Sequence, residues 1–240
     1  MLYTLKGIVL RVVEYSESSL VVTAYTDLFG LQSYIVKGAR KKNSKTKPSY
    51  FQPLSLVEMV VFKSSGEKLN TIQEIKINKA FASIPFDIKK QAVAFFINEL
   101  LVKTIKEEEP NGELFSFLFS SIQLLDVFTG NCSNFHLVFT LQLSRFLGFY
   151  PQGFSTGRNY FDLVNGCFVA TSPQHFYILS PQYALLLQQV IETSLSTCDT
   201  ISISSETRVE FIDKLIEYYS LHIPSFKNLR SVEVLKAVFS

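Results

Sequence analysis

The sequence contains no tryptophan, few cysteines and no two cysteines in a CxxC spacing. Its three cysteines, Cys132, Cys167 and Cys198, are more than 30 residues apart from one another. A structural zinc site needs four ligands at close spacings, and a small secreted disulfide framework needs an even set of cysteines. We therefore expect neither, and we interpret the three thiols as reduced core residues of a cytosolic protein.

The motifs that mark common active sites are also missing. There is no GxSxG, no GxxxxGK followed by Ser or Thr, and no GxGxxG after a predicted strand. His136, His175 and His222 form no HxxxH or HExxH pair, so we interpret them as surface or hydrogen-bonded core residues. Cys167 and His175 are close in sequence, but two candidate ligands without further partners do not make a zinc site. The sequence predicts no metal, no cofactor and no bond-breaking enzyme.

No segment combines the length and the apolarity of a membrane span. The longest uncharged run, residues 163–191, includes Pro173, His175 and other polar groups that a bilayer core would leave unsatisfied. The N-terminal stretch contains Lys6 and Arg11 and lacks the ordered regions of a signal peptide. We expect a cytoplasmic protein that is neither exported nor embedded in a membrane.

Apolar and aromatic residues, in contrast, are abundant. The composition is 47% hydrophobic and 18% charged, with 22 Phe and 11 Tyr, which is far from the composition of disordered chains. The net charge of +2 conceals an asymmetry, because residues 1–80 hold 12 Lys and Arg against 6 Asp and Glu, whereas residues 81–240 hold 11 against 15. The first part is therefore basic and suited to a polyanion, and the second part is acidic.

Residues 3–77 favour β-strands, because β-branched and aromatic residues alternate there in five short runs separated by turn signals. The runs are LKGIVLRVVEY (5–15), LVVTAYT (20–26), LQSYIVKG (31–38), LSLVEMVVF (54–62) and LNTIQEIKI (69–77). Five short strands suit a small antiparallel barrel, since closing the sheet removes its exposed edges.

After Pro85 the hydrophobic period changes from two to that of a helix. Asp87 is a plausible N-cap for a first helix, which is so apolar that it should be buried on much of its circumference. Further helices are expected at 112–129, 134–148, 182–196, 205–221 and 230–239. We expect Ser205 to supply the capping signal of the 205–221 helix and Arg208 to face outward.

The predicted fold class is α+β. A five-stranded antiparallel barrel at residues 1–80 is followed by an all-helical domain at 81–240. A loop-rich insert interrupts the helical domain at about 149–181, with a small hairpin around Asn165 and Gly166.

Residues 38–53, GARKKNSKTKPSYFQP, carry the clearest functional signal. Five cations without one acid lie between Gly38 and Pro48, and the aromatic residues Tyr50 and Phe51 follow. A segment with small and polar residues among its cations can follow a nucleic-acid backbone, while nearby aromatic rings stack on bases. The alternative is a solvated loop, with Tyr50 and Phe51 pointing into the core.

Residues 4–44, TLKGIVLRVVEYSESSLVVTAYTDLFGLQSYIVKGARKKNS, resemble the N-terminal signature of the RecO family of bacterial recombination mediators. The likeness continues through YFQPLSLVEMVVF and LNTIQEIKI, and then through RFLGFYPQ, YFDLVNG and LRSVEVLKAVF. It therefore spans nearly the whole chain, and the first 80 residues are the most specific. The resemblance implies an oligonucleotide-binding barrel followed by a helical domain.

The resemblance also implies a function. RecO-like proteins bind single- and double-stranded DNA without sequence specificity, anneal complementary strands and help to load recombinase. They work with RecR and with the C-terminal tail of the single-strand-binding protein, and a contact with RecF is left open here. Two other functions stay open, namely an RNA-binding OB-fold protein and an adaptor whose basic loop docks acidic proteins.

In one respect the chain departs from the family. Many members carry two cysteine pairs as a zinc module after the LGxxP segment, and here only Cys167 remains. We therefore expect no metal and a degenerate insert held by the packing of its own side chains. Those side chains are Tyr160, Phe161, Val164, Phe168 and Phe176.

We assign the DNA contacts to cations that neutralise phosphates and to rings that stack on bases. The DNA-binding candidates are Lys37, Arg40, Lys41, Lys42, Lys45, Lys47, Tyr50, Tyr34 and, as a second-rank contact, Arg11. The tail of the single-strand-binding protein is acidic and apolar, so its site should combine a cation with an apolar groove. Arg145 beside Phe146 is the candidate for that site.

Overall fold

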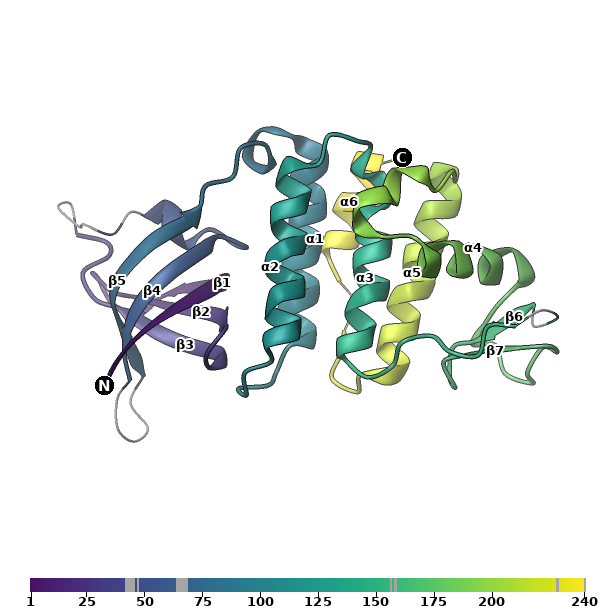
Figure 1. The fold of residues 1–240 in the computed structure, drawn as a ribbon, viewed down its shortest axis with the longest axis horizontal. Coiled ribbons are helices and arrows are strands. Elements are labelled where there is room, and N and C mark those ends of the chain that lie inside the picture. Colours follow the sequence, from purple (N-terminus) through teal and green to yellow (C-terminus); the bar gives the residue numbers. More distant parts are fainter. Residues whose placement is uncertain are drawn as a thin grey trace. The chain divides into compact units, whose positions relative to one another are not determined.

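The computed structural model describes residues 1–41, 46, 48–63, 69–155, 157, 159–227 and 229–239. The chain forms two compact units that do not follow its order. The first comprises Met1–Ala82 and Ile105–Gln123, and the second comprises Ser83–Thr104 and Leu124–Ser240. A β-barrel makes up most of the first unit, and helices make up most of the second (Figure 1). The α+β fold class is confirmed.

The five predicted strands of the barrel all form. They are β1 (Leu2–Glu14), β2 (Leu20–Thr26), β3 (Gly30–Val36), β4 (Leu56–Phe62) and β5 (Asn70–Lys79). They close into a barrel in the order β1-β2-β3-β5-β4, and every pairing is antiparallel except the short parallel one between β3 and β5. This is a five-stranded barrel of the OB type (Figure 1).

Side chains that alternate along the strands fill the barrel interior. On β3, Tyr34 and Val36 are buried in this core, while Ile35 between them is only partly buried. The interior set also includes Leu5, Val9, Val22, Val57, Met59, Val61 and Ile72. An irregularity in β1 between Val9 and Arg11 leaves one extra residue on that strand, as in a β-bulge.

The segment after the first long helix returns to the barrel unit. The backbone N–H of Leu31 donates to the carbonyl of Glu107 at 3.1 Å, and the rings of Tyr25 and Phe115 lie 6.3 Å apart. Gly30 has a φ of +61°, and a Cβ at this position would collide with the backbone carbonyl of Glu109. The turn between β2 and β3 is therefore built around a glycine that this segment covers.

All six predicted helices form. They are α1 (Ile88–Thr104), α2 (Gly112–Val127), α3 (Phe135–Phe146), α4 (Pro181–Glu192), α5 (Ser205–His222) and α6 (Ser231–Phe239). Short 3-10 helices occur at η1 (Pro48–Phe51), η2 (Ile84–Phe86), η3 (Cys132–Asn134) and η4 (Leu195–Thr200). As predicted, α1 is buried on much of its circumference, including Phe96, Ile97 and Leu101. Ile88 and Phe95 of the same helix are exposed. In the part of the chain that the structure describes, no helix is long and apolar enough to cross a membrane.

Two aspartates fix the start of α1. Asp87 caps the helix, since its Oδ1 accepts from the backbone N–H groups of Lys89 and Lys90 at 2.8 and 3.2 Å. Asp126 accepts from the N–H groups of Ser83 and Ile84 at 2.9 and 3.0 Å, and the buried Lys90 ammonium donates to its carbonyl at 2.9 Å. The Asp126 bonds satisfy backbone groups that precede the helix, and the Asp87 bonds satisfy N–H groups of its first turn.

Two expectations for α5 are wrong. The N-cap is Ser204 rather than Ser205, because the Ser204 hydroxyl accepts from the backbone N–H of Thr207 at 3.1 Å. Arg208 does not face outward but is half-buried, and its Nε donates to the Asn134 side chain at 2.9 Å. A hydrogen-bonding partner distant in sequence therefore draws the guanidinium inward.

The insert forms a small sheet, and the hairpin expected around Gly166 is confirmed. Its strands are β6 (Tyr160–Asp162), β7 (Cys167–Val169) and β8 (Ile178–Leu179), in the order β7-β6-β8. Phe161 and Phe168 are buried, with ring centroids 5.0 Å apart, and Phe161 also packs edge-on against Tyr218 at 5.6 Å. Val164 and Phe176 are exposed, so the expected role of these two residues in the packing is wrong.

We predict that Gly30→Ala lowers the free energy of unfolding of the barrel by about 2–4 kcal/mol, because it adds left-handed strain and a backbone collision. Gly38→Ala is the matched control. Gly38 also has a positive φ, of +71°, but the nearest atom to its Cβ position is Lys41 Cδ at 3.7 Å. Its expected cost is only the strain, about 1–2 kcal/mol. Urea unfolding of both variants measures the difference, and equal losses would contradict the prediction.

Candidate nucleic-acid interface

The outer face of the barrel across β1, β2 and β3 carries rows of residues paired by the strand register. Arg11 pairs with Thr23, Thr23 pairs with Ser33, and the two hydroxyls are hydrogen-bonded at 3.0 Å. Arg11 itself is exposed, as a DNA contact requires. The next row consists of Val13, Val21 and Ile35. In an OB barrel the face of the second and third strands, with the loops that flank it, is where oligonucleotides bind.

The basic segment starts at the end of β3, and its first residues are fixed to the barrel. Ala39 is buried in the barrel core, while Lys37 and Lys41 on either side are exposed. The backbone N–H of Lys41 donates to the carbonyl of Gly38 at 3.2 Å. The predicted contacts Lys42, Lys45 and Lys47 lie outside the described residues. The cations of the segment therefore begin at a defined point of the barrel.

Arg40 is engaged with the turn between β1 and β2. Its backbone N–H donates to the carbonyl of Ser18 and its Nη1 donates to the carbonyl of Ser16, both at 3.2 Å. The same Nη1 lies 2.9 Å from a carboxylate oxygen of Glu14, and the Arg40 side chain is 37% exposed. These contacts tie the start of the basic segment to the turn, while the predicted contact between Arg40 and phosphate stays a prediction.

Tyr34 is not a stacking face, and that prediction is wrong. Its side chain is 0% exposed inside the barrel, and burial raises the pKa of its hydroxyl to about 12. The cause is its position on β3, because the alternation that buries Val36 also turns Tyr34 inward. Tyr50 lies half-buried in η1 next to the buried Phe51. Its role in stacking stays a prediction.

Tyr15 is the aromatic residue that the sequence interpretation missed. It follows β1 directly, two residues beyond Val13, and it is 64% exposed at the β1–β2 turn. The signal was present in the sequence, because Arg11, Val13 and Tyr15 lie at alternate positions of β1 and its end, on the same face. The sequence alone did not connect Tyr15 with the basic segment, because Tyr15 precedes Arg40 by 25 positions.

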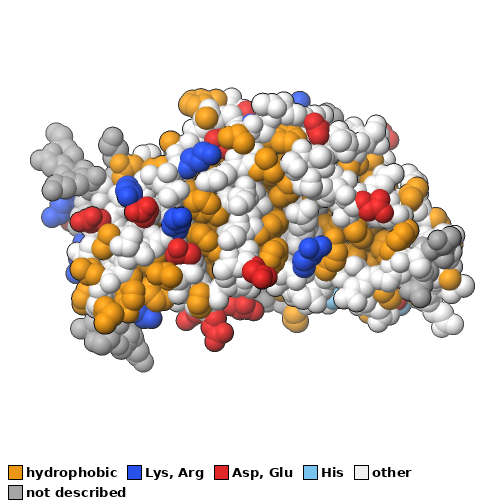
Figure 2. All heavy atoms as spheres, in the orientation of Figure 1, with side chains coloured by type: hydrophobic (Ala, Val, Ile, Leu, Met, Phe, Trp, Pro, Cys, Tyr) orange, Lys and Arg blue, Asp and Glu red, His pale blue; other side chains and the backbone are white. Residues whose placement is uncertain are grey.

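Acidic residues gather at the other end of β3. Glu107, Glu108 and Glu109 are exposed in the segment that contacts Leu31, and Glu113 follows at the start of α2. These acids lie near the first residue of β3, and the exposed Lys37 follows its last residue. The two ends of β3, a strand that spans about 20 Å, therefore carry opposite charge. Elsewhere, on the face drawn in Figure 2, Lys and Arg lie scattered among Asp and Glu and form no single basic patch. The charge asymmetry thus favours the end of the barrel that carries Lys37 for a polyanion.

Arg145, the candidate for partner binding, is exposed near the end of α3. Its guanidinium carbon lies 4.6 Å from the centroid of the Tyr150 ring, in a cation–π arrangement. Phe146, its neighbour, is half-buried. A guanidinium over a ring still has N–H donors available, which suits a carboxylate. The structure thus leaves Arg145 accessible, and its partner stays a prediction.

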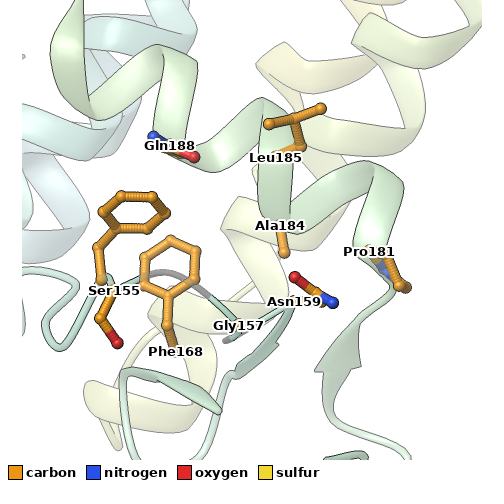
Figure 3. A pocket seen from close by; sticks show the side chains of 9 residues that line it. Ser155, Gly157, Asn159, Phe168, Pro181, Ala184, Leu185 and Gln188 are labelled. Atoms are coloured by element: carbon orange, nitrogen blue, oxygen red, sulfur yellow. The ribbon is translucent and has the colours of Figure 1, made fainter. Parts of the chain in front are cut away.

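A groove of about 420 Å³ lies between the insert and α4 (Figure 3). Phe154, Phe168, Ala184 and Leu185 form its apolar part. The polar side chains on its lining are those of Ser155, Asn159 and Gln188. None of the described residues that line it is charged, so the groove lacks the cation that an acidic peptide needs.

The insert does not fit a zinc ion. Tetrahedral zinc needs four N or S ligands, and within the described residues no group of three or more His, Cys, Asp and Glu side chains has the geometry of a metal site. Instead Asp162 organises the turn between β6 and β7. It accepts from the N–H groups of Val164 and Asn165 at 2.8 and 3.1 Å and lies 3.3 Å from the His175 ring.

Comparison with known proteins covers both units. The family model for the N terminal of recombination protein O matches residues 1–81, and the model for its C terminal matches residues 85–231. A DNA repair protein RecO of Bacteroides fragilis is 38% identical over the whole of both chains. RecO proteins of Phocaeicola vulgatus and Flavobacterium psychrophilum are each 36% identical, over 100% and 98% of both chains.

The Asp162 turn predicts a pH-dependent contribution to stability. Burial tends to raise the pKa of Asp162, but hydrogen bonds from Asn165 and Val164 and the charge of His175 outweigh it and lower the pKa below its ordinary 3.8. We expect Asp162→Asn to reduce the free energy of unfolding by about 1–3 kcal/mol at neutral pH. A carboxylate with a lowered pKa stabilises above its unfolded pKa, so the difference should vanish as the pH falls through the lowered value.

Urea unfolding of the native protein and the variant across a pH series measures this difference. Asp199→Asn, a change at an exposed acid of the same unit, is the control and should leave the pH profile unchanged. A loss in Asp162→Asn that stays constant down to strongly acid pH would contradict the role of the charge.

Proposed function

The chain belongs to the RecO family, and from this premise we propose that it binds single- and double-stranded DNA without sequence specificity and anneals complementary strands during repair and recombination. Membership in the family gives the role of a DNA repair and recombination mediator. The observation that carries the DNA-binding proposal is the anchored start of the basic segment. Lys37 and Lys41 are exposed on either side of the buried Ala39, at the end of the OB barrel's third strand.

Phosphate contacts explain why binding does not depend on sequence. Lysine and arginine side chains that meet phosphates release condensed counterions, and the backbone charge is the same for every sequence. Lys37 and Lys41, with Lys42, Lys45 and Lys47 next along the chain, supply such contacts. The acidic end of the barrel unit, with Glu107 to Glu109, repels phosphates and so orients the strand toward the basic end.

Annealing requires no further chemistry. Repulsion between phosphates is the main obstacle to the meeting of two strands, and one cationic surface that shields both strands lowers it. Base pairing then supplies the driving force, so no nucleotide hydrolysis is needed and no active-site motif is expected. The proposal is therefore that of a non-enzymatic mediator, cytoplasmic and associated with the nucleoid through its DNA contacts.

The proposed partners act on strands that the single-strand-binding protein coats. We propose that RecR joins this chain in loading recombinase, and that the acidic, apolar tail of the single-strand-binding protein docks at Arg145. The support for this docking site is the exposed Arg145 guanidinium over the Tyr150 ring, which offers donors to a carboxylate. The uncharged groove between the insert and α4 is less suited to that tail.

The first test measures the binding of a labelled single strand across a salt series. In the test variant Lys37, Lys41, Lys42, Lys45 and Lys47 are changed to Ser. We expect the slope of log affinity against log salt to shrink by about 3.5, from roughly 0.7 per contact, and annealing to be lost. In the control variant an equal charge is removed at exposed or half-exposed lysines outside the segment, namely Lys79, Lys89, Lys106, Lys214 and Lys227.

A control slope close to that of the native chain, together with a collapsed slope in the test variant, supports the proposal. An unchanged slope in a folded test variant would mean that the segment is only a solvated loop. Matched RNA strands in the same series address the RNA-binding alternative, because a preference for RNA requires contacts to the 2′-hydroxyl.

The partner test uses a labelled peptide of the single-strand-binding protein's tail. We predict that Arg145→Ala weakens its binding about tenfold or more, because a hydrogen bond to a charged group contributes about 1.5–3 kcal/mol. Arg230→Ala, at another exposed arginine of the same unit, should leave the affinity unchanged. Fluorescence anisotropy measures both variants, and full binding by Arg145→Ala would remove this site.

A further inference from the structure

Tyr15 differs from the other described aromatic residues of the barrel strands and turns in how much of it meets solvent. Its side chain is 64% exposed, more than that of Phe62 at 43%, while Tyr25 and Tyr34 are buried. Single exposed apolar residues are common and need no explanation by themselves. What singles out Tyr15 is its surroundings, because the turn that carries it is held rigidly and lies beside the basic segment.

Backbone hydrogen bonds close the turn immediately after Tyr15. The Tyr15 N–H donates to the carbonyl of Ser19 at 3.0 Å, and the Ser16 N–H donates to the same carbonyl at 3.3 Å. In return the Ser19 N–H donates to the Ser16 hydroxyl at 3.1 Å. The backbone on both sides of the exposed ring is therefore fixed, which reduces the entropy lost when a ligand contacts the ring.

Arg40 reinforces this turn from the basic segment. It contacts the residues on both sides of Tyr15, through the ion pair with Glu14 at 2.9 Å and the hydrogen bond to the Ser16 carbonyl at 3.2 Å. The backbone N–H of Arg40 also donates to the carbonyl of Ser18, so a further hydrogen bond joins the basic segment to the turn. The start of the basic segment is therefore joined to the turn that carries Tyr15.

The charges on the turn favour a base over a phosphate as the group that the ring meets. Arg40 offsets the charge of Glu14, but Glu17 is exposed at the tip of the turn and repels phosphates. Phosphates can instead contact the exposed lysines Lys37 and Lys41, which lie close to Arg40 in the sequence. An exposed aromatic ring on a turn that contacts a basic segment is an arrangement with which proteins hold unpaired bases.

We propose that Tyr15 is a platform on which an unpaired base stacks, and that Arg40 is the positioning residue that holds the platform beside the phosphate-binding lysines. This inference rests on the proposed DNA binding and names the ligand of the turn as a base of single-stranded DNA. A duplex offers no free base face along its length, since its bases already stack on one another. Tyr15 therefore selects single strands, whereas the lysines serve single strands and duplexes alike.

Tyr15→Ala tests the platform against a single strand and a duplex of equal length. We expect the affinity for the single strand to fall about 5- to 150-fold, the range for one stacked base, and the salt slope to stay unchanged. The affinity for the duplex should hardly change. Tyr15→Phe, which keeps the ring, should bind both as the native chain does. Equal affinity of Tyr15→Ala and the native chain for the single strand would overturn the proposal.

The absence of tryptophan from the chain allows a direct readout of stacking. Tyr15→Trp introduces a single indole whose fluorescence a stacked base quenches, and we expect strong quenching with the single strand and little with the duplex. Phe176→Trp, at a residue 95% exposed in the other unit, is the control and should not be quenched. Saturation of Tyr15→Trp with a single strand without quenching would overturn the proposal.

Arg40→Gln separates positioning from a phosphate contact. If Arg40 acts by holding the turn, the affinity for the single strand falls without a change in salt slope, and no further loss occurs in the Tyr15→Ala background. A slope smaller by about 0.7 would instead make Arg40 a phosphate contact and overturn its positioning role. A native chain that fails to bind DNA would overturn the proposed function itself, whereas a failure confined to Tyr15 or Arg40 leaves that function standing.

Discussion

Closure of the barrel depends on β1, the longest of its described strands, which pairs with two neighbours in succession. Its first half pairs with β4 from Leu2 to Ile8, and its second half pairs with β2 from Gly7 to Glu14. A Cβ at Gly7, where the two pairings overlap, would come within 2.7 Å of Met59 Cε. Beyond Gly7, β1 continues along β2, and its end leads into the turn that carries Tyr15 and contacts Arg40. The whole candidate interface therefore depends on the course of one strand.

The elements could be predicted because each has a clear period. Five alternating runs became five strands, and the switch of period after Pro85 became six helices. It was harder to predict which side chains of a strand point into the core, as Tyr34 and Tyr15 illustrate. Both lie in alternating runs, but alternation says only which residues share a face, not which of two apolar faces is inside. The bulge between Val9 and Arg11 shifts the alternation of inward and outward side chains in β1, and the local sequence does not predict it.

Contacts between distant segments account for the other differences. Arg208 was expected to face outward, but its Nε donates to Asn134, 74 residues away, and the side chain is half-buried. Arg40 was grouped with the lysines by charge, although Glu14 and the carbonyls of Ser16 and Ser18 engage it. In both cases the partner belongs to another element, so no window of sequence around the arginine contains it. The basic segment could thus be recognised from the sequence, while the contacts that its first residues make with the barrel could not.

The interleaving of the two units has a consequence for the newly made chain. The barrel strands are complete once residue 79 has been synthesised, but the unit to which they belong also includes Ile105–Gln123. Before that segment emerges from the ribosome, Phe115 cannot cover Tyr25, and Glu107 cannot bond to Leu31. Meanwhile α1, which belongs to the other unit, has already been made. The nascent barrel therefore waits with part of its surface uncovered, and a fragment that ends near Ala82 would keep it uncovered permanently.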